Sequence, residues 1–319
     1  MRATIVIPSL NEGDNLWKTV GSCLETTAGL ECELLVADDA SQDGSPGEVR
    51  RRFPSVRIVA HDRRRGVAPT KDLGARHAAG DVLVFIDGHC KPEPAAIARL
   101  VADVEELNGR AIVTPAVPAL NTDAWTNEFN QVGHGYWMEL EQFTSRWSDT
   151  ATLRRRGRLL ESPALVGCCV AVARTLYDQL LGFDAGMLEW GAEDLDFGLK
   201  AWLMGASVLN DPDAVIGHRF RASFDNFDVS AVQPLVNQLR MAFKNFDDPV
   251  WAEWVSGCRR RHEPWPDLWQ QVWKSFEDGR ESLERERAYL HERRTRDEYW
   301  FAEYFDLPWP RQTSGLRSG

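Results

Sequence analysis

The chain has 319 residues and a formal net charge of −11, with 43% hydrophobic and 27% charged residues. This length and apolar content allow one large domain with an extension, or two modest domains, and they exclude a globally disordered chain. The negative charge argues against nucleic acid or an anionic membrane as the main partner, because both carry the same sign of charge. We interpret the Arg triplets at 50–52, 63–65, 154–156 and 259–261 as mostly solvated surface.

The cysteines and the N-terminal segment bear on the cellular compartment. None of the six cysteines forms a Cys-x-x-Cys pair, so we expect free thiols in a reducing environment. The first residues, MRATIVIPSLNE, lack the long apolar run of a signal peptide, and no stretch approaches 18 consecutive apolar residues. We therefore expect a cytoplasmic protein without a transmembrane segment.

The first 120 residues alternate short β-rich runs with helical patterns. Continuous apolar runs such as VLVFI suit strands buried on both faces, and the alternation predicts an α/β fold with a largely parallel sheet. Ligands of such sheets bind beyond the carboxyl ends of the strands. The predicted strands are Thr4–Ile7, Glu33–Ala37, Val56–Ala60, Val82–Ile86 and Ala111–Thr114. The predicted helices are Asn15–Thr26, Val67–Ala79 and Pro94–Leu107.

The second half of the chain begins less regularly and ends in a helical region. Residues 121–160 show no clear period, and the ordered pattern returns with a strand at Cys168–Ala173 and helices near Thr175–Leu181 and Asp194–Met204. Seven of the 13 tryptophans lie beyond residue 225. Residues 280–298 predict a charged, exposed helix supported by pairs such as Glu281–Arg285.

Trp265, Trp269 and Trp273 recur every four residues and lie on one helical face. We interpret this stripe as a helix that packs on the rest of the protein. A platform for a substrate is the alternative.

The run VLVFIDGHC at residues 82–90 carries the central chemical signal. Alternate residues of an extended chain point the same way, so Asp87 and His89 can address one ion, and Gly88 lets the backbone approach closely. A carboxylate with an imidazole suits a metal such as Mn²⁺ better than Ca²⁺, which prefers oxygen ligands. Such a metal can hold a diphosphate. An Asp-x-His pair is more often incidental, but its place at the end of a buried strand favours a metal site.

Two later segments add candidate groups. Glu193 and Asp194 follow Gly191 and open an apolar helical pattern, where carboxylates suit the positive end of the helix dipole. They are either simple capping residues or include a general base for a hydroxyl group. His218 ends an apolar run, and Arg221 lies three residues later. A histidine there is commonly structural, but it can also be a third metal ligand, with Arg221 pairing with a phosphate.

Six motifs follow one another along the first 225 residues: IPSLNE, LLVADDAS, RRGVAPTKDLGARHAAGDVLVFIDGHC, SPALVGCCVAVAR, FDAGMLEWGAEDLDF and VIGHRFR. With these motifs, the first 225 residues resemble the GT-A fold glycosyltransferases, in particular family 2, and the central motifs also resemble the polypeptide N-acetylgalactosaminyltransferases. The resemblance implies a GT-A catalytic domain at 1–225 that binds a UDP-sugar donor and Mn²⁺ or Mg²⁺. Residues 226–319 show no such resemblance and are predicted to form a helical C-terminal extension, and no lectin domain is evident.

The resemblance also implies roles on the nucleotide side of the site. Asp39 would meet the uracil, with Asp38 as a weaker candidate, and Pro8 and Glu12 would line the nucleoside pocket. Lys71 lies where the peptide transferases place a basic residue near the nucleotide.

On the sugar side, Gly167 would approach the donor sugar, Glu193 would hold its hydroxyls, Trp190 would flank the catalytic centre and Arg221 would meet the diphosphate. We interpret residues 121–160 as an insertion that faces the acceptor. The metal ligands that the resemblance implies are Asp87, His89 and His218.

One departure from the peptide transferases affects the mechanism. Those retaining enzymes have Glu-Asn after Trp-Gly-Gly, whereas this chain has Glu193-Asp194 after Trp190-Gly191-Ala192. Glu-Asp resembles the inverting enzymes of this fold, in which the Asp is the base, and Asn cannot accept a proton from a hydroxyl. We therefore predict an inverting transferase with Asp194 as base.

Several alternatives stay open at this point. A retaining peptide-type transferase and an inactive nucleotide-sugar-binding relative are the main ones. A nucleotidyltransferase usually opens with a Gly-rich, basic signature that IPSLNEGDN lacks. The predicted partners are a nucleotide-sugar donor and an acceptor that is a peptide, a glycan or a small natural product, with no nucleic acid.

Overall fold

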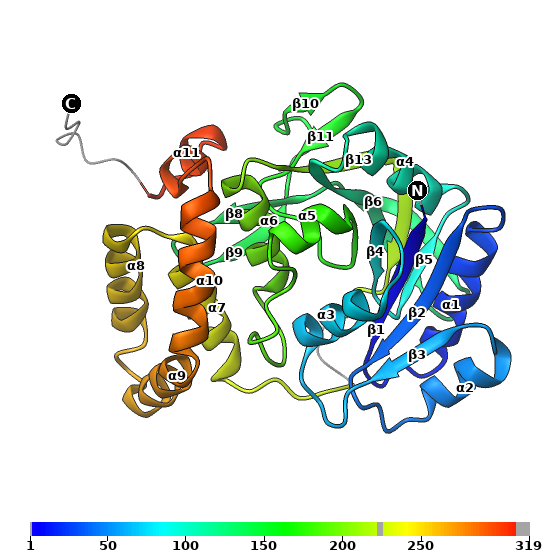
Figure 1. The fold of residues 1–319 in the computed structure, drawn as a ribbon, viewed down its shortest axis with the longest axis horizontal. Helices are drawn as coiled ribbons and strands as arrows, with labels where there is room; N and C mark the ends of the chain where they lie inside the picture. Colours follow the sequence, from blue (N-terminus) through cyan, green and yellow to red (C-terminus); the bar gives the residue numbers. More distant parts are fainter. Residues whose placement is uncertain (1, 222–225, 311–319) are drawn as a thin grey trace.

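The computed structural model describes residues 2–221 and 226–310 (Figure 1). The strands that it contains are β1 (Ala3–Ser9), β2 (Cys32–Asp38), β3 (Arg57–Ala60), β4 (Val82–Ile86), β5 (Cys90–Pro92), β6 (Ala111–Asn121), β7 (Thr126–Gly133), β8 (Tyr136–Glu139), β9 (Thr144–Trp147), β10 (Arg155–Arg156), β11 (Leu159–Glu161), β12 (Cys169–Ala173) and β13 (Ser207–His218). The helices are α1 (Asp14–Thr26), α2 (Ser45–Arg52), α3 (Val67–His77), α4 (Ala96–Glu106), α5 (Arg174–Gln179), α6 (Glu193–Leu203), α7 (Gln233–Asn245), α8 (Asp248–Arg261), α9 (Pro266–Asp278), α10 (Arg280–Arg293) and α11 (Glu298–Tyr304).

The main sheet is mixed, with the strand order β10-β11-β13-β6-β12-β4-β1-β2-β3. Two further strands lie off this path: β5 pairs with β13, and β7 pairs with β6. Strands β3, β2, β1 and β4 are mutually parallel, as the alternating pattern predicts. Strand β12 runs antiparallel between β4 and β6. The four central strands β1, β2, β4 and β12 are almost entirely buried, which explains their continuous apolar sequences. The carboxyl ends of β1, β2 and β4 therefore meet at one edge of the sheet.

The structure departs from the predicted elements in three places. Helix α2 was missed, because SPGEVRRR is short and buries only Ser45 and Val49. Strand β6 continues past the predicted end at Thr114 to Asn121, and its register shifts against β13 and β7 lie beside Pro115 and Pro118. Residues 121–160 are not irregular but form the strands β7 to β11.

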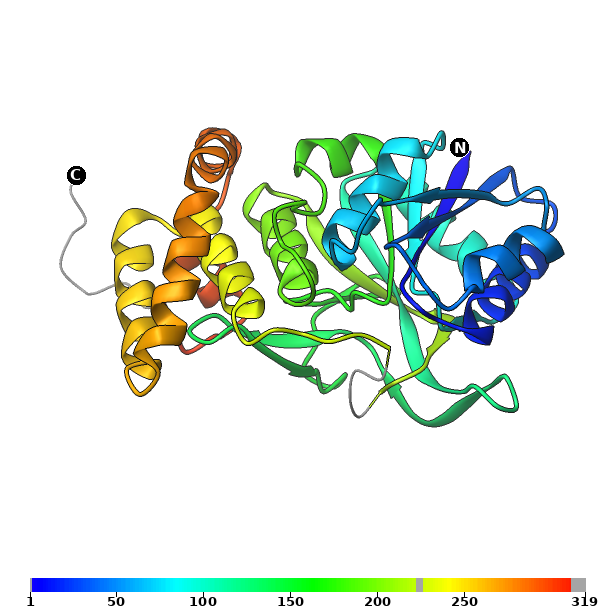
Figure 2. The ribbon, with the colours of Figure 1, turned by 90° about the horizontal axis from the view of Figure 1, so that it is seen from below.

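The C-terminal region is helical, as predicted, and its helices pack on the sheet-bearing part. Both ribbon views place α7 between α6 and the outer helices α8, α9 and α10 (Figures 1 and 2). Helix α10 covers α7 with the buried side chains of Leu283 and Leu290, so it is less exposed than its charged sequence suggested. The predicted boundary at 225 falls on residues outside the described part of the chain.

The structure confirms the packing interpretation for two of the three tryptophans in the stripe. Trp269 and Trp273 are partly buried against the core and stack on each other with ring centroids 6.0 Å apart, whereas Trp265 is 57% exposed. All six cysteines are free thiols, as expected. Among the described helices, none combines the length and the apolar content that crossing a bilayer requires.

Candidate active site

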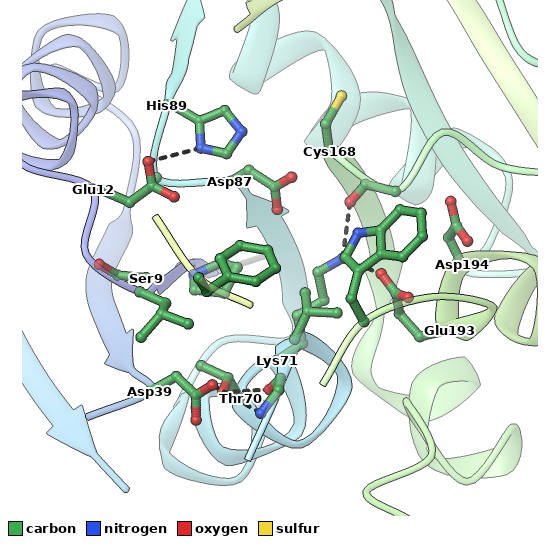
Figure 3. Close-up of a pocket in the computed structure, with 18 of the residues that line it drawn as sticks. Ser9, Glu12, Asp39, Thr70, Lys71, Asp87, His89, Cys168, Glu193 and Asp194 are labelled. Carbon is green, nitrogen blue, oxygen red and sulfur yellow. Dashed lines mark hydrogen bonds and ion pairs between the residues drawn. The ribbon is translucent and has the colours of Figure 1, made fainter. Parts of the chain in front are cut away.

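A cavity of about 430 Å³ lies beyond the carboxyl ends of β1, β2 and β4 (Figure 3). Its walls come from segments far apart in sequence, including the end of β1, the start of α3, the residues after β4 and the loop that leads into α6. All twelve predicted site residues line it: Pro8, Glu12, Asp39, Lys71, Asp87, His89, Gly167, Trp190, Glu193, Asp194, His218 and Arg221. Asp38, the weaker candidate, does not line the cavity; its carboxylate accepts a hydrogen bond from the amide of Ser41 at 3.1 Å.

The three predicted metal ligands converge. One ligand atom each of Asp87, His89 and His218 lies within 4.8 Å of the other two. The Nε2 atoms of the two imidazoles are 3.0 Å apart, and Nε2 of His218 lies 3.8 Å from Oδ2 of Asp87. Side chains this close together would be able to hold one ion between them. Burial, together with His89 and Arg221, holds the pKa of His218 well below its ordinary value, so the imidazole is neutral, the form that binds a metal. The residues present therefore fit a divalent cation.

Glu12 fixes the orientation of His89. Its Oε2 lies 3.0 Å from Nδ1 of His89 and accepts a 2.5 Å bond from Nη2 of Arg221. Burial alone would raise the pKa of Glu12, but His89 and the Arg221 guanidinium bring it below its ordinary value. A carboxylate on Nδ1 turns Nε2 of the ring toward His218 and Asp87, the arrangement that supports metal-bound histidines in many proteins. The sequence placed Glu12 in the pocket but did not indicate this pairing.

Lys71 is the buried cation of the site. Its side chain is 1% exposed, and its ammonium donates to the carbonyl of Gly167 at 3.0 Å and lies 3.6 Å from the Glu193 carboxylate (Figure 3). Burial would lower the pKa of Lys71, but Asp87, Glu193 and Asp194 together raise it above its ordinary value. The ammonium therefore stays charged beside the metal ligands and can attract an anionic ligand.

The two acids at the start of α6 face different surroundings. Glu193 lies beside Lys71, whereas Asp194 lies against Gly167, where an added Cβ would be 2.9 Å from the Asp194 Cβ. Burial and the neighbouring Glu193 raise the pKa of Asp194 to about 7. A partly buried carboxylate with a pKa near neutrality is suited to accept a proton. The identity of residue 167 as glycine thus keeps this carboxylate open to the cavity.

Asp39 closes the cavity on the side of β2. Its two carboxylate oxygens accept hydrogen bonds from the amides of Arg65 and Gly66 at 2.6 and 2.8 Å. Burial raises the pKa of Asp39 despite these bonds. Asp39 therefore holds the 65–66 turn against the site, a role that the motif alone did not reveal.

Sequence reasoning missed several lining residues, among them Tyr136 and Phe220. Tyr136 comes from the 121–160 region, and Trp147 of the same region contacts both residues, with ring centroids 4.5 and 5.9 Å apart. Tyr136 thus brings part of the 121–160 region to the cavity, and the orientation of this region toward an acceptor stays a prediction. Trp125 instead donates to Ser22 at 2.9 Å, on the face of α1. No motif marked Tyr136, because its position follows from the pairing of β8 with β9.

Residues 4–181, more than half of the chain, match the family model described as "Glycosyl transferase family 2". The chain belongs to this family. Residues 150–222 also match a model described as "N-terminal domain of galactosyltransferase". The family assignment accounts for the sheet and for the segments that carry Asp39, Asp87 and His89.

The curated relatives of this family 2 member include polypeptide N-acetylgalactosaminyltransferases. Polypeptide N-acetylgalactosaminyltransferase 11 of Xenopus tropicalis is 31% identical to this chain over 234 residues, which are 69% of this chain and 38% of the relative. Polypeptide N-acetylgalactosaminyltransferase 12 of Mus musculus is 27% identical over 282 residues, which are 84% of this chain and 48% of the relative. The chain thus spans less than half the length of these relatives. Because 84% of the chain is more than residues 1–225 contain, the similarity enters the helical region, which we had expected to resemble nothing.

Two solved structures share the fold. GalNAc-T7 with UDP, GalNAc and Mn²⁺ matches with a TM-score of 0.75 and 21% identity, over 95% of this chain and 56% of that chain. The mannosyltransferase PcManGT from Pyrobaculum calidifontis, in complex with GDP-Man and Mn²⁺, matches with a TM-score of 0.53 and 19% identity, over 91% of this chain and 85% of that chain. The expected GT-A fold with a helical C-terminal region is therefore confirmed.

Proposed function

We propose that this family 2 member is a metal-dependent glycosyltransferase that moves a hexose or N-acetylhexosamine from a UDP-sugar to an acceptor nucleophile. The observation that carries the proposal is the meeting, in one cavity, of the Asp87–His89–His218 cluster with the Glu193–Asp194 pair. The solved structure of GalNAc-T7 with UDP, GalNAc and Mn²⁺ supports the choice of donor and metal.

Asp87, His89 and His218 would hold Mn²⁺ or Mg²⁺, with Glu12 keeping the His89 ring in place. When bound, the metal neutralises charge on the diphosphate and so makes UDP a better leaving group. Arg221 and Lys71 add positive charge to the lining of the cavity, where they would bind phosphate oxygens. Pro8 and Asp39 would border the nucleoside.

Asp194 would act on the acceptor. We propose that its carboxylate takes the proton of the acceptor nucleophile as the nucleophile forms a bond to the anomeric carbon from the face opposite UDP. The bond between that carbon and UDP breaks, UDP leaves with the bonding electron pair, and the anomeric centre is inverted. Glu193 would hold donor-sugar hydroxyls from its place beside Lys71, and Gly167 and Trp190 would flank the sugar. Deprotonation by Asp194 is consistent with its raised pKa and with its opening toward the cavity at Gly167.

A retaining, peptide-type reaction is the second candidate, because the curated relatives are polypeptide N-acetylgalactosaminyltransferases. A peptide is accordingly one proposed acceptor, beside a glycan or a small natural product. The Asp at position 194, in place of the Asn of the peptide transferases, favours inversion.

The deciding experiment has two stages. A screen of UDP-sugars with Mn²⁺ for protection against thermal unfolding identifies the donor, because a ligand that binds only the native state raises its stability. The product of that donor is then examined by NMR for its anomeric configuration. Inversion supports the proposed mechanism, retention favours the second candidate, and the absence of any metal-dependent transfer or hydrolysis would leave only a binding protein.

A further inference from the structure

The segment 188–191, which carries Trp190 into the cavity and leads to α6, has an unusual backbone. Glu189 and Ala192 have positive φ values of 55° and 69°, and Gly191 has a φ of 104°. A left-handed conformation is unfavourable for a residue other than glycine, so it persists only where surrounding contacts hold it. These contacts therefore decide where Trp190, Glu193 and Asp194 lie.

One set of contacts to this segment comes from residues 65–67, which Asp39 holds in place. The amide of Glu189 donates to the carbonyl of Arg65 at 3.0 Å, and the amide of Val67 donates to the carbonyl of Glu189 at 3.0 Å. Gly66 lies so close that an added Cβ would be 2.2 Å from the Glu189 nitrogen. Asp39 in turn accepts the amides of Arg65 and Gly66. These bonds fix one flank of the segment.

The other flank is held by a side chain of the C-terminal helical region. The Asn237 amide nitrogen, on α7, lies 2.9, 3.3 and 3.0 Å from the carbonyls of Leu188, Trp190 and Gly191. Asn237 is 1% exposed, and its oxygen accepts a 3.0 Å bond from the Gln233 side chain, which sets the amide orientation. The two N–H donors of one buried amide thus lie within hydrogen-bond distance of three carbonyls of the bent segment.

Helix α7 is itself tied to the chain on both sides of this segment. Arg240 and Lys244 form ion pairs of 2.7 and 2.6 Å with Asp184, which precedes the segment. Lys244 also pairs at 3.1 Å with Asp196, which lies in the first turns of α6. Asn237 is therefore held in a fixed position relative to the residues that it contacts.

We propose that Asn237 is a positioning residue, through which the C-terminal helical region sets the place of Trp190, Glu193 and Asp194 in the cavity. None of the cavity-lining residues in the described part of the chain belongs to α7–α11, so this contribution is made without contact to the donor. The inference rests on the proposed glycosyl transfer for its reaction.

The test compares Asn237→Ala with Asn245→Ala in the full chain. Asn245 is also a buried asparagine of α7, and it bonds Asp196 and the Met241 carbonyl but not the 188–191 segment. Both variants are expected to lose stability. Only Asn237→Ala is expected to lower kcat, by about 10- to 100-fold, since small misplacements of reacting groups have effects of this size. Its Mn²⁺-dependent affinity for UDP, which lacks the sugar, should stay near the wild-type value.

Hydrogen exchange supplies a readout that is independent of activity. The backbone amides of residues 187–192 should exchange faster in Asn237→Ala and stay protected in Asn245→Ala. If Asn237→Ala does not fold, Gln233→Ala is used, because it removes the bond that orients the Asn237 amide. For this variant a smaller loss of kcat and faster local exchange are expected.

Wild-type kcat with unchanged exchange in the folded variant, or an equal kcat loss in Asn245→Ala, would overturn the proposal. An inactive wild type would instead overturn the proposed function, and exchange would still test Asn237.

Discussion

At the scale of single residues, Asp194 links the proposed reaction to stability. Its folded-state pKa of about 7 lies above the ordinary value for aspartate, so the folded protein favours the protonated form. Ionisation of Asp194 therefore costs stability progressively as pH rises from about 4 to about 7. Asp194→Asn removes this cost, and we predict a variant with a higher Tm than wild type at pH 8 and an equal Tm below pH 4, by metal-free calorimetry.

The same substitution tests catalysis. Base catalysis typically contributes about 10²–10⁴-fold, and Asn cannot take up the proton, so turnover should fall by that factor while donor affinity changes little. Wild-type turnover should decline as pH falls through about 7, where the Asp194 carboxylate becomes protonated. Glu193→Gln serves as comparison and should weaken donor binding as well as turnover. Near-normal turnover of Asp194→Asn would contradict the assignment of the base.

His89 tests the metal site. EDTA should abolish transfer and Mn²⁺ should restore it, and His89→Ala should weaken Mn²⁺-dependent UDP binding by at least about tenfold. Calorimetric titration of UDP with and without Mn²⁺ measures this effect. The exposed His77, at the end of α3, provides the matched His→Ala control and should bind as wild type. Full activity in EDTA would exclude a metal-dependent mechanism.

At the scale of elements, the contact between α6 and α7 depends on buried charges. Lys244 is 1% exposed and pairs with both Asp184 and Asp196. Lys244→Met leaves these carboxylates short of a partner in a buried site, so we predict a loss of about 3–5 kcal/mol in unfolding free energy, measured by denaturant titration. Arg285→Met, which breaks the exposed pair with Glu281, should leave the midpoint unchanged.

At the scale of the whole molecule, the helical region is part of the same folded unit as the sheet. Trp254 of α8 donates to the Leu140 carbonyl at 3.1 Å, and the rings of Trp300 and Phe305 pack on Trp202 of α6. Removal of residues 226–319 should expose this apolar surface and make the remainder aggregate. A soluble truncated protein with full transfer activity would show that the helical region is dispensable.

The sequence by itself determined the fold class and the twelve predicted site residues, because apolar runs, strand ends and ordered motifs are local features; it did not indicate Tyr136 or Phe220, which also line the cavity. The sequence predicted the Asp87–His89 pair from the alternation of a strand, but β4 ends at Ile86 and both residues lie in the connection to β5. Glu193 and Asp194 open α6, as the sequence predicted. The tertiary structure decided what those groups touch. It brings His218 to 3.0 Å from His89 across 129 residues of sequence, turns Glu12 onto His89, and sets Asn237 against the 188–191 segment. No local pattern encodes these contacts, because they arise only when strands and helices distant in sequence pack together.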